Sequence, residues 1–305
     1  MLTVKNISYS YPSEKKTALS RISFTLNKGT VLGIAGTSGS GKSTLLKAIY
    51  GLIDLPEGEI YFNKQKVSGP SKNLIPGHQQ MRLSGQFHSL QNSLPVIEQI
   101  KYKLLNYEKS FREKKAKQLL SLVGLEKYGM KLPKELSGGQ QQMIHLCCAL
   151  AEEPELLLLD EPFNNLDQSS KGNLKKYLTE LKRSGMSIIV VSHDSMDLLS
   201  LSDNILILKD GKKIQTDIPE KIYFQPGNEY TAALFGEYNK VKSNFIRPSK
   251  VLLTRVKKTG FTEGKITSAQ FRGRYYLYEI SSGKNKILAA SSLNYKPGKI
   301  FYKTA

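Results

Sequence analysis

Alternating apolar and polar residues predict several strands in the first part of the chain. Residues 2–11 alternate in this way, and "SRISFTLNKG" repeats the alternation before a turn. "TVLGIAG" is instead continuously apolar, which is typical of a short strand buried on both faces. "KSTLLKAIYGL" has helical spacing and stops at Gly51. "GEIYFNKQKV", at residues 58–67, is expected to form one further strand.

Helical spacing replaces this pattern from Pro95 to about Cys148, in "VIEQIKYKLL", "FREKKAKQLLSLVGL" and the stretch after "LSGGQ". Two apolar strands, "ELLLLD" and "MSIIVVS", follow on either side of a charged helix, and "NILILKDGKKIQ" is typical of a hairpin that turns at Asp210-Gly211. Strands that alternate with helices predict an α/β fold with a largely parallel sheet covered on its faces. The helical block, at about residues 87–150, interrupts the alternation and is expected to be an inserted subdomain.

The pattern changes again after Tyr238. Five short strands broken by Gly or Pro are expected there, in "VLLTRV", "GKITSAQF", "RYYLYEI", "KILAAS" and "KIFYKT". Such a series is typical of a small β-barrel or sandwich. The sequence therefore predicts one large domain over residues 1–236 and a small β domain over residues 240–305.

The positive charge of the chain is concentrated in this tail. The net charge is +19, and residues 240–305 contain fifteen Lys or Arg against two acids, Glu263 and Glu279. This asymmetry can indicate contact with nucleic acid or with an anionic membrane surface. The alternative that we favour is a small domain kept soluble by its lysines.

The composition excludes several other classes of protein. The 39% of hydrophobic residues is enough for a full-sized core, and the two cysteines, Cys147 and Cys148, are adjacent, so they are expected to be reduced core residues. The first residues lack the apolar segment of a signal peptide, and the longest apolar runs are far below the ~20 residues that span a bilayer. We therefore expect a soluble protein that reaches a membrane only through a partner.

A phosphate-binding loop follows the buried strand "TVLGIAG". The segment "GTSGSGKST" contains the spacing G-x-x-x-x-G-K-S between a strand and a helix, which is the context that a P-loop requires. Its main-chain N–H groups and the helix N-terminus would hold the phosphates, Lys42 would reach the β- and γ-phosphates, and Ser43 would coordinate Mg²⁺. The predicted nucleotide-binding residues are Gly36, Thr37, Ser38, Gly39, Ser40, Gly41, Lys42, Ser43 and Thr44.

Two later strands end in residues that suit hydrolysis of a nucleotide. Asp160 closes "LLLLD" and is expected to hold the Mg²⁺ shell. Glu161 comes one residue later, where it could orient or deprotonate the attacking water. His193 follows "IIVVS" at the carboxyl end of the next strand, where ligands of parallel sheets gather, and is expected to sense the γ-phosphate.

These motifs together resemble the ATP-binding cassette (ABC) family over residues 1 to about 236. The resemblance rests on "GTSGSGKST", "LSGGQQQ", "LLLLDEP", "NNLD" and "VVSHD", in the order of the family. It implies a P-loop NTPase core, an antiparallel β subdomain and an inserted helical subdomain. It also implies that Gln86 touches Mg²⁺ or the lytic water, that Tyr11 stacks on adenine, with Tyr9 as the alternative, and that Asp167 contacts the opposite subunit.

The chain departs from the family at two positions after "LSGGQ". Met143 and Cys148 stand where the family commonly has Arg. The loss of two cations near a bound nucleotide would change affinity or packing, but it leaves the residues that carry the chemistry in place.

The motif "LSGGQ" is a second anion-binding segment without a lysine. Ser137 and the N–H groups of Gly138 and Gly139 stand at a predicted helix N-terminus, which favours an anion. The resemblance implies that Ser137, Gly138, Gly139 and Gln140 contact the γ-phosphate held by the P-loop of a second copy. Each ATP site would then be complete only in a head-to-tail dimer.

The tail resembles the small OB-like (TOBE-like) domain of several importer ATPases in "FIRPSK" and "GKITSAQFRG". The resemblance implies an ATP-hydrolysing subunit that uses ATP and Mg²⁺ and works on the inner face of the cell membrane with permease subunits and a solute-binding protein. An exporter ATPase is one alternative. A soluble ATPase that acts on the ribosome or nucleic acid through the basic tail is another, although nucleic acid is an unlikely partner because such relatives usually carry two cassettes in one chain.

Overall fold

The structure is a computed structural model that describes residues 1–12, 17–75, 77–84, 90–164 and 166–304. The chain divides into two compact units, Met1–Pro219 and Glu220–Ala305. The first unit contains two β-sheets and a group of helices, and the second contains short helices, a small hairpin and an antiparallel sheet. Within the described residues, no helix is both long and apolar enough to cross a bilayer.

An antiparallel sheet forms from the first segments of the chain, with the strand order β2-β1-β4-β5. Its strands are β1 (Leu2–Ser10), β2 (Thr17–Leu26), β4 (Glu57–Phe62) and β5 (Gln65–Lys66). The prediction of one unbroken strand over residues 58–67 is wrong, because Asn63 and Lys64 turn the chain back. Both residues have positive φ, 48° and 68°, as the tightest hairpin turns require.

A six-stranded sheet lies at the centre of the first unit, in the order β10-β9-β3-β8-β7-β6. Its strands are β3 (Val31–Ala35), β6 (Met81–Ser84), β7 (Leu156–Asp160), β8 (Ser187–Val191), β9 (Asn204–Lys209) and β10 (Lys212–Asp217). The pairs among β9, β3, β8, β7 and β6 are parallel, and β10 returns antiparallel after the turn at Asp210 and Gly211. The largely parallel sheet and the final hairpin are confirmed.

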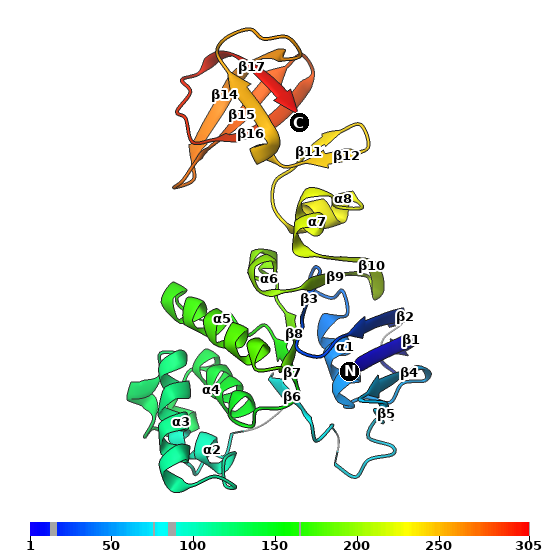
Figure 1. Cartoon of the computed structure of the whole chain (residues 1–305), viewed down its shortest axis with the longest axis vertical. Coiled ribbons are helices and arrows are strands. Elements are labelled where there is room, and N and C mark those ends of the chain that lie inside the picture. Colours follow the sequence, from blue (N-terminus) through cyan, green and yellow to red (C-terminus); the bar gives the residue numbers. More distant parts are fainter. Residues whose placement is uncertain (13–16, 76, 85–89, 165, 305) are drawn as a thin grey trace. The chain divides into compact units, whose positions relative to one another are not determined.

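Helix α1 (Lys42–Tyr50) lies between the two sheets (Figure 1). Its residues Leu45, Leu46 and Ile49 are at most 1% exposed and share one core with residues of both sheets. Burial of each such side chain stabilises the fold by roughly 1.5–3 kcal/mol. This core fixes the start of α1, and therefore the P-loop, against the central sheet. Helices α5 (Gln168–Arg183) and α6 (Ser195–Leu201) follow β7 and β8.

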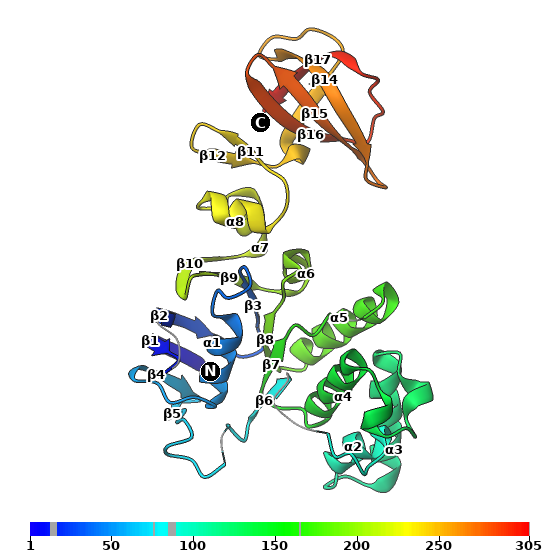
Figure 2. The same ribbon diagram turned by 180° about the vertical axis from the view of Figure 1, so that it is seen from behind.

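A group of helices packs beside β6. It contains α2 (Val96–Tyr102), α3 (Lys109–Leu122) and α4 (Gly138–Ala151), with 3₁₀ turns at Glu126–Tyr128 and Pro133–Glu135. Cys147 and Cys148 lie on α4 as buried free thiols, as expected, and burial raises the pKa of Cys148 to about 12. Figure 2 shows this helical group apart from the antiparallel sheet, with the central sheet between them.

The second unit is built on a five-stranded antiparallel sheet with the order β13-β17-β14-β15-β16. The strands are β13 (Val251–Thr254), β14 (Thr262–Phe271), β15 (Tyr276–Ser282), β16 (Asn285–Ser291) and β17 (Gly298–Thr304). These are the five strands that the sequence predicts. The other elements are α7 (Pro219–Phe224), α8 (Glu229–Leu234), β11 (Asn239–Val241), β12 (Asn244–Ile246) and a 3₁₀ turn (Pro248–Lys250).

The compact units divide at Pro219/Glu220, whereas the sequence places the boundary between residues 236 and 240. The side chain of Arg247 accounts for the difference. It is 1% exposed and donates hydrogen bonds to the carbonyl oxygens of Tyr223 (2.8 Å) and Ala232 (2.9 Å). Helices α7 and α8 are therefore fastened to the tail. Burial lowers the pKa of Arg247, and the carbonyls at the end of α8 compensate its charge.

Candidate active site

The loop between β3 and α1 is packed tightly against neighbouring strands at two of its glycines. Gly41 precedes α1 with φ 101°, and a Cβ there would lie 2.4 Å from the carbonyl oxygen of Ala18. A Cβ on Gly36 would lie 2.3 Å from the carbonyl oxygen of Leu208. Neither position can accept a side chain without a shift of neighbouring backbone. The close packing of this loop against β2 and β9 explains both glycines of the motif.

Lys42 lies inside the loop rather than on the surface. Its side chain is 8% exposed, and Nζ donates to the carbonyl oxygens of Gly36 (2.8 Å) and Thr37 (2.9 Å). Burial lowers the pKa of Lys42, and the nearby carboxylates of Glu161 and Asp160 oppose that effect. The ammonium is therefore held at the centre of the loop, next to both acids predicted from "LLLLDE".

Asp160 ends β7 and lies beside the P-loop helix. Burial raises the pKa of this carboxyl, while a hydrogen bond with Ser43 acts in the opposite direction. The structure thus places the Ser43 hydroxyl and the Asp160 carboxyl together. Both are hard oxygen donors of the kind that Mg²⁺ prefers. Gln86, the third predicted ligand, lies outside the described residues.

Glu161 and His193 are in direct contact at the ends of neighbouring strands. Asp160 pairs with Val191 across β7 and β8, and the N–H of Glu161 then donates to the carbonyl oxygen of Val191 at 3.0 Å. Oε2 of Glu161 accepts the main-chain N–H of His193 at 2.9 Å and lies 2.8 Å from His193 Nδ1. Glu161 has φ 53°, an unusual backbone angle that aims the carboxylate toward His193.

Tyr11 lies close to the end of the P-loop segment. Its hydroxyl is 3.2 Å from Oγ1 of Thr44, and its ring stands edge-on to the ring of Tyr9 at a centroid distance of 5.0 Å. Nζ of Lys47 lies 6.0 Å from the centroid of the Tyr11 ring. The hydrogen bond links Tyr11 to Thr44 of the predicted nucleotide-binding segment.

Ser137 and Asp167 are both helix N-caps. Ser137 Oγ accepts the N–H of Gln140 at 3.3 Å, and Gln140 Oε1 accepts the N–H of Ser137 at 3.0 Å, which forms a capping box at the start of α4. At the start of α5, Asp167 accepts the main-chain N–H of Ser170 at 2.9 Å and also the hydroxyl of Ser170. These two hydrogen bonds lower the pKa of Asp167. The views in Figures 1 and 2 place α4 and α1 on either side of strands β6–β8. The capping box therefore belongs to a segment that the fold separates from Lys42.

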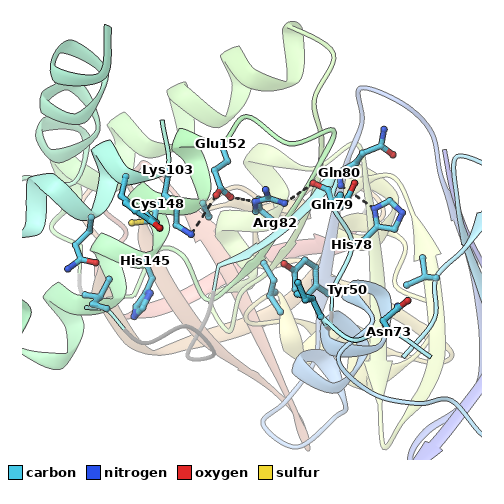
Figure 3. Close-up of a pocket in the computed structure, with 18 of the residues that line it drawn as sticks. Tyr50, Asn73, His78, Gln79, Gln80, Arg82, Lys103, His145, Cys148 and Glu152 are labelled. Carbon is cyan, nitrogen blue, oxygen red and sulfur yellow. Dashed lines mark hydrogen bonds and ion pairs between the residues drawn. The ribbon is translucent and has the colours of Figure 1, made fainter. Parts of the chain in front are cut away.

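A groove that sequence reasoning missed lies between the central sheet and the helical group (Figure 3). Its volume is about 880 Å³. Among its lining residues, Arg82 pairs with Glu152, whose other oxygen lies 3.6 Å from Nζ of Lys103. Cys148 lines the same groove. The lining residues come from distant segments, such as the loop before β6 and the last turn of α4, so no local sequence motif predicts the groove.

Comparison with known proteins identifies relatives of the whole site. Residues 19–164 match the ABC transporter family. The chain is 34% identical over 256 residues to the glucose import ATP-binding protein GlcV of Saccharolobus solfataricus, covering 82% of this chain and 72% of that one. It is 29% identical over 331 residues to the spermidine/putrescine import ATP-binding protein PotA of Borreliella afzelii, covering 98% of this chain and 94% of that one. A dimeric post-hydrolysis structure of the ATP-binding cassette MJ0796 bound to ADP and Pi matches with a TM-score of 0.62 and 27% identity, covering 72% of this chain and 99% of that one.

Proposed function

The chain belongs to the ABC transporter family of ATP-binding proteins, and from this premise we propose that it is the ATP-hydrolysing subunit of an importer. The observation that carries the proposal is the contact between Glu161 and His193 beside a P-loop that encloses Lys42. This arrangement combines a phosphate cradle, a cation and a carboxylate at the carboxyl ends of parallel strands. Those are the components that hydrolysis of a nucleoside triphosphate requires.

ATP would lie with its phosphates on the loop of residues 36–44 and its base against Tyr11. The N–H groups at the start of α1 and the Lys42 ammonium would neutralise the phosphate charge. The hydrogen bond between Tyr11 and Thr44 supports this placement, because it brings the aromatic ring to the loop.

The residues near Lys42 fit a magnesium ion. Ser43 and Asp160 supply a hydroxyl and a carboxyl oxygen in mutual contact, and Gln86 would add an amide oxygen. When bound, the ion would supply positive charge that offsets the negative charge of the phosphates. A bound cation would also offset the burial that raises the pKa of Asp160.

Glu161 would act as the general base in hydrolysis. With Nδ1 protonated, His193 donates both its main-chain and its ring N–H to Oε2 of Glu161, and Oε1 would be the oxygen that meets the attacking water. Glu161 accepts a proton from this water as it attacks the γ-phosphate in line. His193 fixes the position of Glu161 and, from its exposed ring, senses the γ-phosphate.

A second copy of the chain would complete each ATP site. Ser137, Gly138, Gly139 and Gln140 of one copy would contact the γ-phosphate held by Lys42 of the other, and Asp167 would contact the opposite subunit. The dimeric structure of the MJ0796 cassette bound to ADP and Pi supports this arrangement. ATP would join the two copies, and loss of the γ-phosphate would let them separate.

Transport requires membrane permease subunits, and we place their contact at the groove beside Arg82 and Glu152. The groove lies between the central sheet and the helical group, so closure of the dimer would reach the permease there. The protein would then work on the inner face of the membrane, with a solute-binding protein on the other side. Import rather than export is supported by the relatives named above, which are import proteins.

Purification of the tagged full chain from its own cells tests this proposal. We expect membrane permease subunits in detergent to co-purify with it, and ATP hydrolysis by the complex. Substitution of Lys103 by Glu in the groove would weaken recovery of the permease, whereas Lys286→Glu on the tail would not. Recovery of ribosomes or RNA in place of a permease, sensitive to salt, would support the alternative in which the basic tail binds nucleic acid.

A further inference from the structure

Two lysines of α5 meet two aspartates at the start of α6, of which Asp194 caps the helix and directly follows His193. Nζ of Lys171 lies 2.7 Å from Asp197 Oδ2 and 3.2 Å from Asp194 Oδ2. Nζ of Lys175 lies 2.9 Å from Asp197 Oδ1. Asp197 is 4% exposed, so its carboxylate depends on these two cations for compensation. The four side chains form one ion cluster between the starts of the two helices.

Phe163 forms the base of this cluster. Its side chain is 6% exposed, and the ammonium groups of Lys171 and Lys175 lie 6.0 and 5.6 Å from its ring centroid. Phe163 is two residues after Glu161, so the cluster rests on the segment that carries the proposed base. Cations over an aromatic ring are attracted to its electron-rich face.

Lys171 differs from Lys175 because it contacts both the Asp167 segment and the aspartate that follows His193. The N–H of Lys171 donates to the carbonyl oxygen of Asp167 at 2.9 Å, which places Lys171 in the first turn after the residue that would face the second copy. Its ammonium contacts Asp194, which follows His193 and caps α6 by accepting the N–H of Met196 at 3.1 Å. Lys175 lies one turn further along and contacts Asp197 and the hydroxyl of Ser200. Of the ion pairs described for these two lysines, the one with Asp194, next to His193, is made by Lys171.

We propose that Lys171 is a positioning residue that couples the dimer contact at Asp167 to the orientation of His193 for hydrolysis. The inference rests on the proposed function. When the second copy presses on the Asp167 segment, α5 carries Lys171 with it, and Lys171 holds Asp194 and therefore His193 in the geometry that fixes Glu161. The route is short and contiguous: one helical turn, one ion pair and one peptide bond.

The test compares steady-state hydrolysis by Lys171→Met with that by the matched control Lys175→Met. We expect Lys171→Met to lower kcat about tenfold while ATP affinity stays within about twofold of wild type, a typical effect of a coupling residue remote from the ligand. Lys175→Met removes an equal charge from the same cluster and is expected to keep kcat within about twofold of wild type. Lys171→Arg should restore most of kcat because it can still reach both aspartates.

A double-mutant cycle keeps the test decisive if Lys171→Met is poorly folded. Asp194→Asn acts on a half-exposed side chain, and the effects of Lys171→Gln and Asp194→Asn on kcat should be strongly non-additive. Additive effects, equal losses in Lys171→Met and Lys175→Met, or a loss of ATP affinity in place of kcat would each overturn the inference. Wild-type chain that neither hydrolyses ATP nor dimerises would instead contradict the proposed function itself.

Discussion

Glu161→Gln is expected to abolish turnover while allowing an ATP-bound dimer to accumulate. Glutamine keeps the shape of the side chain and can still accept the main-chain N–H of His193 through its amide oxygen. It cannot take a proton from water, so the loss should be at least about a hundredfold, as expected for removal of a general base. Phosphate release measures the turnover, and size-exclusion chromatography with ATP and Mg²⁺ measures the dimer.

Glu180→Gln is the matched control for this substitution. Glu180 is exposed on α5, so the same chemical change there should leave both hydrolysis and dimerisation unaltered. Hydrolysis by Glu161→Gln at the rate of wild type would remove Glu161 from its role. Loss of hydrolysis without any ATP-bound dimer would mean that the substitution acts on folding or binding.

Lys42→Ala is expected to reduce ATP affinity strongly. The ammonium is buried in the loop and held by the carbonyl oxygens of Gly36 and Thr37, where it would meet the β- and γ-phosphates. Charge-assisted hydrogen bonds of this kind contribute about 1.5–3 kcal/mol each, so affinity should fall at least tenfold. Titration with a fluorescent ATP analogue gives the affinity directly.

Lys28→Ala provides the comparison for the loss of a charge in the same unit. Lys28 is exposed before β3, and its removal should leave ATP affinity unchanged. Thermal unfolding of both variants separates a loss of binding from a loss of structure. ATP affinity of Lys42→Ala equal to that of wild type would contradict the assignment of the phosphate loop.

The motifs that the sequence reveals best are those whose partners are near in the chain. The P-loop is one contiguous segment whose glycines are required by backbone packing, so its chemistry could be read without a structure. The pattern of buried strands likewise predicted the central sheet, because parallel strands covered on both faces are continuously apolar. Strand β6, with only four residues, is too short to show a period and was not predicted.

Features that depend on distant partners could not be predicted. The Arg247 side chain is bound by main-chain carbonyls of α7 and α8, which any sequence there would supply, so no residue pattern marks the boundary at Pro219. The contact of Glu161 with His193 was foreseen only as two strand ends at one edge of a sheet. The ion cluster of Lys171 depends on how α5 and α6 lie together, which neither helix encodes alone.

The "LSGGQ" segment shows what a single chain leaves incomplete. Ser137 and Gln140 exchange hydrogen bonds in a capping box, which explains how the helix starts. The capping box alone does not explain why the segment should bind an anion. We propose that binding of an anion by this segment requires another copy of the chain. The central claim is therefore that each ATP site is shared, with Lys42 from one copy and Ser137 from the other.

Mixing two inactive variants tests this claim most directly. Lys42→Ala lacks the phosphate cation, and Ser137→Glu would place a carboxylate against the γ-phosphate of the second copy. If sites are shared across a two-fold interface, about half of the dimers in an equal mixture pair the two variants, and each of these contains one intact site of two. Hydrolysis should then return to about a quarter of wild type. Hydrolysis by the mixture no greater than that of either variant alone would contradict the shared site.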